Sequence, residues 1–287
     1  MSHDPVVIVN GARTPMGGFQ GNLSSVTATT LGAISIREAL KRAGVQPEQV
    51  QEVIMGCVLP AGLKQGPARQ AALEAGIPAA AGATTVNKLC GSGMKATMLA
   101  HDLIKAGTND IMVAGGMESM SNAPYILPKA RGGYRMGHGQ IMDHMFLDGL
   151  EDARTGRLMG SFAQDMATTL GLGRADMDAF AVESLRRANA AIANGDFKAE
   201  IVAVPVSTRK GEVLVDTDEQ PGNANPEKIP TLKPAFAKDG TITAANASSI
   251  SDGASALVLM KESKARELGL QPLARIVGHS TQSQDPS

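Results

Sequence analysis

Short apolar runs alternate with segments whose apolar residues recur at helical spacing through the first 115 residues. Runs rich in apolar and β-branched residues predict short strands, and apolar positions three or four residues apart predict helices. The predicted strands are Val6–Val9, Val53–Met55, Thr84–Val86 and Asp110–Ala114, and the predicted helices are Thr30–Ala43, Pro67–Ala75 and Met94–Gly107. This alternation is typical of an α/β layered domain.

The pattern changes near Ser119. From Ser119 to about Asp148 the chain is rich in Gly, Met, Pro and His without a clear period, which predicts a functional or interface loop. Beyond it we expect helices at Phe162–Leu170, Ala175–Asn194 and Lys261–Gly269, strands at Ile201–Val206, Ala256–Met260 and Ala274–Gly278, and a polar loop at Gly211–Leu232.

Composition narrows the class of protein. The 287 residues are 43% hydrophobic and 19% charged, so a sizeable hydrophobic core is expected. The net charge of −1 predicts no general electrostatic attraction to nucleic acid. We find no apolar run long enough to span a membrane and no signal peptide. With two cysteines, Cys57 and Cys90, a reducing, cytoplasmic setting is expected.

No spacing among the histidines predicts a metal site, and we expect none. The residues considered are His3, His101, His138 and His144, and His279 is interpreted as a surface or structural residue. Cys57, in an apolar strand-end context, is expected to pack as a small hydrophobic side chain.

Cys90 lies in the segment Val86-Asn-Lys-Leu-Cys-Gly-Ser-Gly-Met-Lys95, at the start of a predicted helix. Gly91 and Gly93 would allow positive φ and a close approach of another molecule to the backbone. The helix dipole and unpaired amides favour a thiolate there, and the Cys90 amide is a candidate oxyanion donor. Cys90 is therefore either a nucleophile or a buried structural cysteine, and its local spacing alone leaves both open.

Several motifs together resemble the thiolase family, which includes the acetyl-CoA acetyltransferases. The Cys90 segment is similar to the family's nucleophile segment, and Gly115-Gly-Met-Glu-Ser-Met-Ser121 to its signature after the next strand. Similar segments occur in the family's order at Asn10–Gly17, Pro67–Ala71, Leu232–Phe236 and Asp239–Ser248, so the resemblance covers essentially the whole chain.

The resemblance implies a thiolase-like αβα-layered N-terminal domain with an inserted α+β loop domain. It implies that Cys90 forms an acyl thioester, that acetyl-CoA is substrate rather than cofactor, and that the chain forms a dimer or tetramer. The implied role is in fatty acid metabolism, with no nucleic acid or membrane partner. Substrate contacts carried over from the family are Leu150, Met159, Ala244 and Ser248.

Some of the family's groups do not occur in this sequence. These are a second cysteine in a Cys-x-Gly segment, a histidine in Gly-His-Pro and an Asn-Glu-Ala-Phe motif. The family's order places them after residue 287, so we expect a C-terminal thiolase domain to be absent from this sequence. The expected domains are residues 1–118 with 250–270, a loop domain of 119–249, and 271–287 as the start of the absent domain.

Other functions are possible on the sequence. The chain can be an incomplete thiolase that acts only as a CoA-binding or subunit-partner module, or a longer-chain 3-ketoacyl-CoA thiolase of β-oxidation. A β-ketoacyl synthase would need two downstream histidines. An enzyme resembling aldehyde dehydrogenases would need a dinucleotide-binding fingerprint, which we do not find.

Overall fold

Seven strands form one mixed sheet in the computed structural model, which describes residues 4–285. Strands β1, β10 and β5 are antiparallel neighbours, and β5, β3 and β4 are parallel. The order is β11-β1-β10-β5-β3-β4 with β2 paired to one end of β10, and the bounds are β1 Val6–Arg13, β2 Gly17–Gly18, β3 Glu52–Gly56, β4 Gly82–Val86, β5 Ile111–Ser119, β10 Ser251–Lys261 and β11 Ala274–Arg275.

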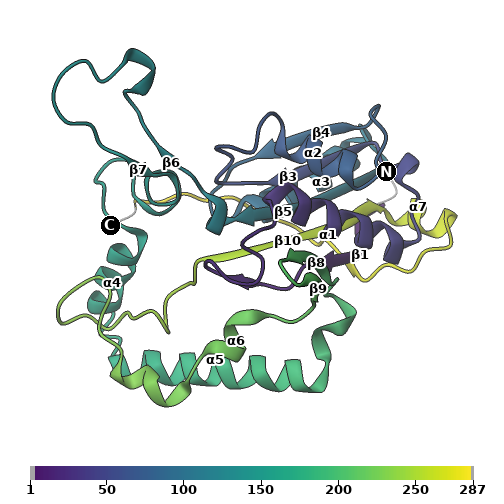
Figure 1. Ribbon diagram of the computed structural model, residues 1–287. Coiled ribbons are helices and arrows are strands. Elements are labelled where there is room, and N and C mark those ends of the chain that lie inside the picture. Colours follow the sequence, from purple (N-terminus) through teal and green to yellow (C-terminus); the bar gives the residue numbers. More distant parts are fainter. Residues whose placement is uncertain (1–3, 286–287) are drawn as a thin grey trace.

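Helices cover the sheet on both faces (Figure 1). Helices α1 (Ala28–Ala43) and α2 (Pro67–Glu74) pack on one face, and α3 (Ser92–Ala106) packs on the other. A separate hydrophobic core lies on each face of the sheet. Because successive strand residues point to opposite faces, each central strand contributes side chains to both of these cores. The core under α3 consists of Val6, Ile54, Ala96, Ala100, Ile104, Met112, Ala114 and Leu259.

Local signals explain where the covering helices begin and end. The Thr27 hydroxyl accepts the Thr30 amide at 3.2 Å and caps the start of α1. Gly44, with φ of 68°, ends α1, and Gly107, with φ of 78°, ends α3. Glycine is the usual residue in this left-handed conformation at the C-terminus of a helix.

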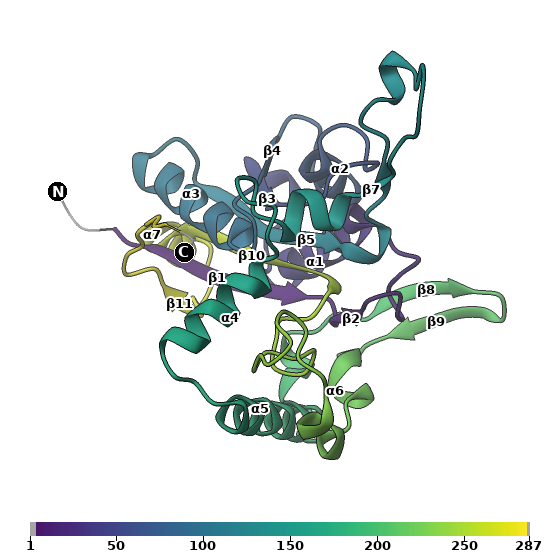
Figure 2. The same cartoon turned by 90° about the vertical axis from the view of Figure 1, so that its left-hand side faces the viewer.

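The chain between β5 and β10 contributes no strand to the large sheet, and Figure 1 shows it, from teal to green, beside the sheet. Its longest element is α5 (Arg174–Asn194), which lies apart from the sheet in both views (Figure 2). The other elements are β6 Tyr125–Ile126, β7 Met142–Asp143, a π-helix Met145–Leu150, α4 Met159–Thr169, β8 Val204–Thr208, β9 Gly211–Val215 and α6 Glu219–Asn223.

The remaining short elements complete the description. They are the 3-10 turns Pro47–Gln49, Met120–Asn122, Ala130–Gly132, Asp196–Ala199 and Pro226–Thr231, and the helix α7 Glu262–Glu267.

Across residues 4–285 no helix combines the length and the apolar character that crossing a membrane requires. The division into a discontinuous domain and a loop domain stays a prediction.

The structure corrects five expectations about elements. Strand β10 begins at Ser251 rather than Ala256, and β5 continues through Gly115 to Ser119. The polar loop expected from Gly211 begins with strand β9, which pairs with β8 through its backbone. The loop expected up to Asp148 includes the first part of the π-helix, and the strand expected over Ala274–Gly278 is limited to two residues.

Arg13, the last residue of β1, attaches the sheet to the segment between β5 and β10. Its guanidinium makes two hydrogen bonds to the Asp218 carboxylate, at 2.7 and 3.0 Å, and one to Glu200 at 2.7 Å. Burial by itself would raise the pKa of Asp218, but the Arg13 bonds and the Met16 amide outweigh it, so that pKa lies below its ordinary 3.8.

We predict that Asp218→Asn lowers the free energy of unfolding at neutral pH by about 2 kcal/mol, since a charge-assisted pair is lost. A lowered folded-state pKa means that the carboxylate stabilises the protein above pH 3.8 and that this stabilisation disappears as the pH falls further. Urea unfolding of both proteins across this range measures the difference.

The matched control is Asp216→Asn, because Asp216 is exposed and, within residues 4–285, its side chain accepts a hydrogen bond only from the neighbouring Thr217 hydroxyl. It is expected to change stability little. Equal stability of Asp218→Asn and the unchanged protein at neutral pH would contradict the role given to the Arg13–Asp218 pair.

Candidate active site

Residues 87–92, here named the Cys90 turn, are held by side chains within the turn itself. The buried Ser92 hydroxyl accepts the Lys88 amide at 2.8 Å and donates to the Leu89 carbonyl at 2.6 Å. The Asn87 side chain accepts the Leu89 amide at 2.9 Å. These bonds support Leu89 in a left-handed conformation, φ 49°, which costs a non-glycine residue about 1 kcal/mol.

The positive φ that Gly91 and Gly93 would allow is not used in the structure. Gly91 has φ of −89° and is the N-cap of α3, and Gly93 has no positive φ either. The reversal of the chain takes place one residue before the cysteine, at Leu89. The glycines act instead through the close approach that their missing side chains allow.

The first turn of α3 packs directly on the backbones of β3 and β5. A Cβ atom at Gly56, the last residue of β3, would lie 2.6 Å from the Ser92 carbonyl carbon and 2.7 Å from the Gly93 nitrogen. A Cβ atom at Gly116 would lie 3.4 Å from the Gly93 Cα. The helix therefore approaches the sheet as closely as two backbones allow at the point where Cys90 is presented.

Cys90 lines a cavity of about 740 Å³. The walls come from the start of α3, the ends of β3, β5 and β10, the segment after β1, and the end of the π-helix. The residues are Arg13–Met16, Gly56, Val58, Leu59, Leu89, Cys90, Ser92–Met94, Thr97, Gly115–Glu118, Met120, Gly149, Leu150, Ser251–Ser255 and Leu257.

The two cysteines are both free but differ in access. Cys90 is exposed, whereas Cys57 is 1% exposed and packs in the core, as the sequence predicted. Burial, together with the neighbouring Glu118 carboxyl at 3.6 Å from the sulfur, raises the pKa of the Cys57 thiol to about 12. Since thiolates rather than thiols are nucleophiles, Cys57 is an unreactive group.

Two carboxyl groups in the cavity wall were missed by sequence reasoning. Glu118 accepts the amides of Val58 at 2.7 Å and Leu59 at 3.0 Å, and burial raises its pKa. Asp252 has no exposed surface, and only its Oδ1 atom has a partner among residues 4–285. Glu118 lies in the segment similar to the family's signature, but its burial, like that of Asp252, depends on strand pairing that no local pattern shows.

Of the four residues carried over as substrate contacts, the structure places Leu150 in the cavity wall. Met159 is the first residue of α4. It is 41% exposed and does not line the cavity. Ala244 and Ser248 are exposed and do not line the cavity either.

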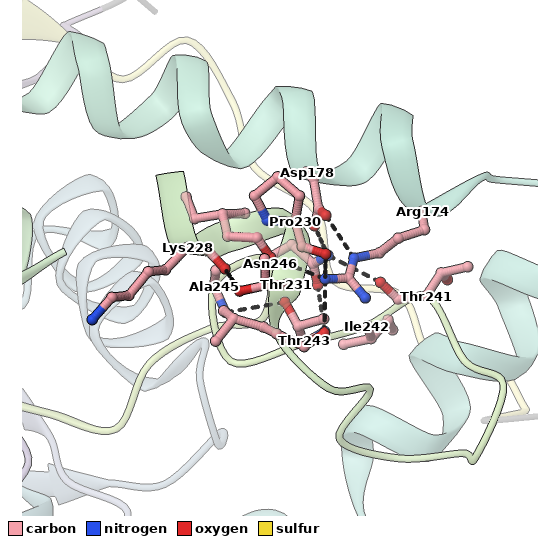
Figure 3. Close-up of polar contacts among 12 residues, drawn as sticks. Arg174, Asp178, Lys228, Pro230, Thr231, Thr241, Ile242, Thr243, Ala245 and Asn246 are labelled. Atoms are coloured by element: carbon pink, nitrogen blue, oxygen red, sulfur yellow. Dashed lines mark hydrogen bonds and ion pairs between the residues drawn. The ribbon is translucent and has the colours of Figure 1, made fainter. Parts of the chain in front are cut away.

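The segment that carries Ala244 and Ser248 is fixed to α5 by polar contacts (Figure 3). Asn246 donates to the buried Asp178 at 3.1 Å and accepts the Thr243 amide at 2.8 Å. Arg174 pairs with Asp178 at 2.6 Å, so the carboxylate joins this segment to the helix. The segment therefore has a defined conformation, although Ala244 and Ser248 do not line the cavity that contains Cys90.

The histidines do not line the cavity within the described residues, and His3 lies outside that range. His144 is buried, with Nδ1 at 2.5 Å from Asp148 and Nε2 accepting the Ala61 amide at 3.4 Å. His138 is exposed. His101 lies on α3, and His279, far from it in sequence, has a ring nitrogen 3.3 Å from that of His101.

Comparison with known proteins identifies the family. The family model described as "Thiolase, N-terminal domain" matches residues 6–263. The acetyl-CoA acetyltransferase of Schizosaccharomyces pombe is 49% identical over 100% of this chain and 73% of its own length. Acetyl-CoA acetyltransferase 2 of Arabidopsis thaliana is 52% identical over 98% of this chain and 70% of its own length.

A solved structure agrees with the fold. The Acat5 thiolase from Ascaris suum, in complex with coenzyme A, superimposes with a TM-score of 0.89 at 40% identity, over 96% of this chain and 70% of that one. These findings confirm the resemblance and the thiolase-like layered fold that the sequence predicts. The chain belongs to the thiolase family.

Proposed function

We propose that the chain is an acetyl-CoA C-acetyltransferase, which reversibly converts two acetyl-CoA into acetoacetyl-CoA and CoA through an acyl-Cys90 intermediate. The observation that carries the proposal is an exposed thiol at the start of a helix, in the wall of a cavity of about 740 Å³. Relatives about half identical in sequence are named acetyl-CoA acetyltransferases, which favours the acetyl group over longer acyl chains.

In the first step, the Cys90 thiolate attacks the carbonyl carbon of acetyl-CoA. A carbon–sulfur bond to Cys90 forms, the bond to the CoA sulfur breaks, and CoA leaves as a thiolate that takes up a proton. Cys90 directly precedes the N-cap of α3, so the positive end of the helix dipole lies beside the sulfur. An amide donor to the developing oxyanion, such as that of Cys90, contributes about 3 kcal/mol when preorganised.

In the second step, a carbanion of another acetyl-CoA attacks the Cys90 thioester, so a carbon–carbon bond forms and the thiolate is released. This step needs a base for the α-proton. Within the described cavity wall the ionisable groups besides Cys90 are Arg13, Glu118 and Asp252, and Glu118 is engaged with two amides. The resemblance gives the proton transfers to motifs that do not occur in the 287 residues. The resemblance also gives activation of the nucleophile to the histidine of Gly-His-Pro, so within the described cavity wall the acyl transfer is proposed to rest on Cys90 itself and on the start of α3.

CoA thioesters are proposed as substrates, with no separate cofactor. Leu150 is proposed to contact the substrate, which its place in the cavity wall supports. Met159, Ala244 and Ser248 are proposed as contacts on the family resemblance alone. A chain that binds CoA without accepting an acyl group would instead fit the alternative of a CoA-binding module.

We further propose a homo-oligomer, dimer or tetramer, in the cytoplasm and in fatty acid metabolism. The two free cysteines support a reducing compartment. The segment 125–141 supports an interface, because Tyr125, Leu127, Met136 and Ile141 expose large apolar side chains there.

Incubation with acetyl-CoA is expected to add one acetyl group per chain to the protein of 29.7 kDa, as a thioester on Cys90. Intact-mass spectrometry followed by peptide mapping measures the modification. Cys57 serves as an internal control, because its buried thiol, with a pKa of about 12, is expected to stay unmodified.

Cys90→Ser is the matched variant, since it keeps the size of the side chain and removes the thiolate. It is expected to lower acetyl incorporation at least 10²-fold, roughly the cost of losing an activated catalytic group. Acetylation that persists in Cys90→Ser, or CoA binding without acetylation of the unchanged chain, would refute the proposed acyl transfer.

For the oligomer, light scattering after size-exclusion chromatography is expected to give a mass at least twice 29.7 kDa. Exchange of Met136 and Ile141, 95% and 69% exposed, for serine is expected to weaken association because apolar contacts are lost. Phe180→Ser, an apolar exchange at a 78% exposed site on α5, is the control. A monomeric unchanged chain would disprove the interface.

A further inference from the structure

Three metal-ligating side chains outside the cavity converge on one point. His101 Nδ1 and His279 Nε2 each lie 2.9 Å from the same Asp102 oxygen, Oδ1, and 3.3 Å from each other. Each residue can offer one ligand atom, and these atoms all lie within 4.8 Å of one another. Both imidazoles therefore turn a ring nitrogen toward the same carboxylate oxygen.

The donor set fits a divalent transition cation. Imidazole nitrogen and carboxylate oxygen are ligands of zinc, with bond lengths of about 2.0–2.2 Å in a tetrahedral arrangement. Ligand atoms around such an ion lie roughly 3.3 Å apart. The observed separations of 2.9 to 3.3 Å need only a small outward shift of the side chains to admit the ion.

The surroundings provide both rigidity and access. His101 is 7% exposed and is anchored in α3, whereas the side chains of Asp102 and His279 are 55% and 22% exposed. The buried His101 holds one ligand atom in a fixed position. The partly exposed Asp102 and His279 leave a path by which the ion can enter and a fourth coordination position for water.

His279 belongs to a segment that is fixed at several other points. The Leu273 amide donates to the Ile8 carbonyl at 2.8 Å, and the Ile276 amide donates to the Val6 carbonyl at 3.0 Å. Beyond His279, the Thr281 hydroxyl approaches the Met98 sulfur on α3 at 3.9 Å. The segment is thus held beside β1 by its backbone and reaches α3 through its side chains, so no ion is needed to bring the histidine there.

We propose that His101, Asp102 and His279 form a binding site for a divalent transition cation of the zinc class. The bound ion would join the segment after β11 to α3, the helix that presents Cys90 at its other end. The site has a structural role at a distance from the cavity and is independent of the proposed acetyl transfer. The expectation of no metal site rested on sequence spacing, and 178 residues separate His101 from His279.

The test measures binding of Zn²⁺ alone by isothermal titration calorimetry. Every sample carries Cys90→Ser, because the exposed Cys90 thiol would otherwise bind zinc. One ion per chain is expected. His279→Ala and Asp102→Asn are each expected to weaken binding at least tenfold, since even loss of groups that only support a ligand costs 10- to 100-fold in affinity.

His138→Ala is the matched control, since His138 is exposed and lies outside the cluster. Unchanged binding in this variant supports the site. A second readout is the melting temperature, which Zn²⁺ is expected to raise in the parent but not in His279→Ala, because an ion bound only by the folded state stabilises it.

Backbone hydrogen bonds to β1 hold the segment around His279, so His279→Ala is expected to fold. The proposal is overturned if the parent binds no zinc, if His279→Ala binds it as tightly as the parent, or if His138→Ala loses binding to the same extent. It is supported by one-to-one binding that both cluster variants weaken and the control does not.

Discussion

Backbone-to-backbone packing between the first turn of α3 and the end of β3 is the constraint on which the site depends. A Cβ atom at Gly56 would lie 2.6 Å from the Ser92 carbonyl carbon, far inside contact distance. Ser92 in turn holds the Cys90 turn through two hydrogen bonds. The position of Cys90, the proposed nucleophile, is therefore fixed by the absence of a side chain on a neighbouring strand.

The energetic balance at this point favours the observed turn. Leu89 in a left-handed conformation costs about 1 kcal/mol, and the three bonds made by Ser92 and Asn87 each contribute about 1 kcal/mol. Small residues on α3, Ala96 and Ala100, let the rest of the helix follow the same close approach into its core. The strained residue and the tight packing thus support each other, and the thiol is left exposed to the cavity.

Most strands and helices of the sheet could be predicted because burial on both faces makes their apolar runs continuous. The start of β10 could not, since the small and polar residues from Ser251 pair with β5 through backbone bonds that no side-chain pattern reveals. The glycine-rich surroundings made Cys90 a candidate, but the family resemblance rather than its local spacing favoured a nucleophile. Asp252 was not, because its burial follows from the register that places it opposite Ser119.

The measurement that tests this account most directly is the rate of Cys90 acetylation by acetyl-CoA in Gly56→Ala, with Gly253→Ala as the control. Gly253 lines the same cavity, but a Cβ atom there would meet its nearest neighbour at an ordinary 3.5 Å. The account predicts a loss of roughly 10²-fold in Gly56→Ala, the scale of a 1 Å misplacement, and little change in Gly253→Ala. Acetylation of folded Gly56→Ala at the unchanged rate would contradict it.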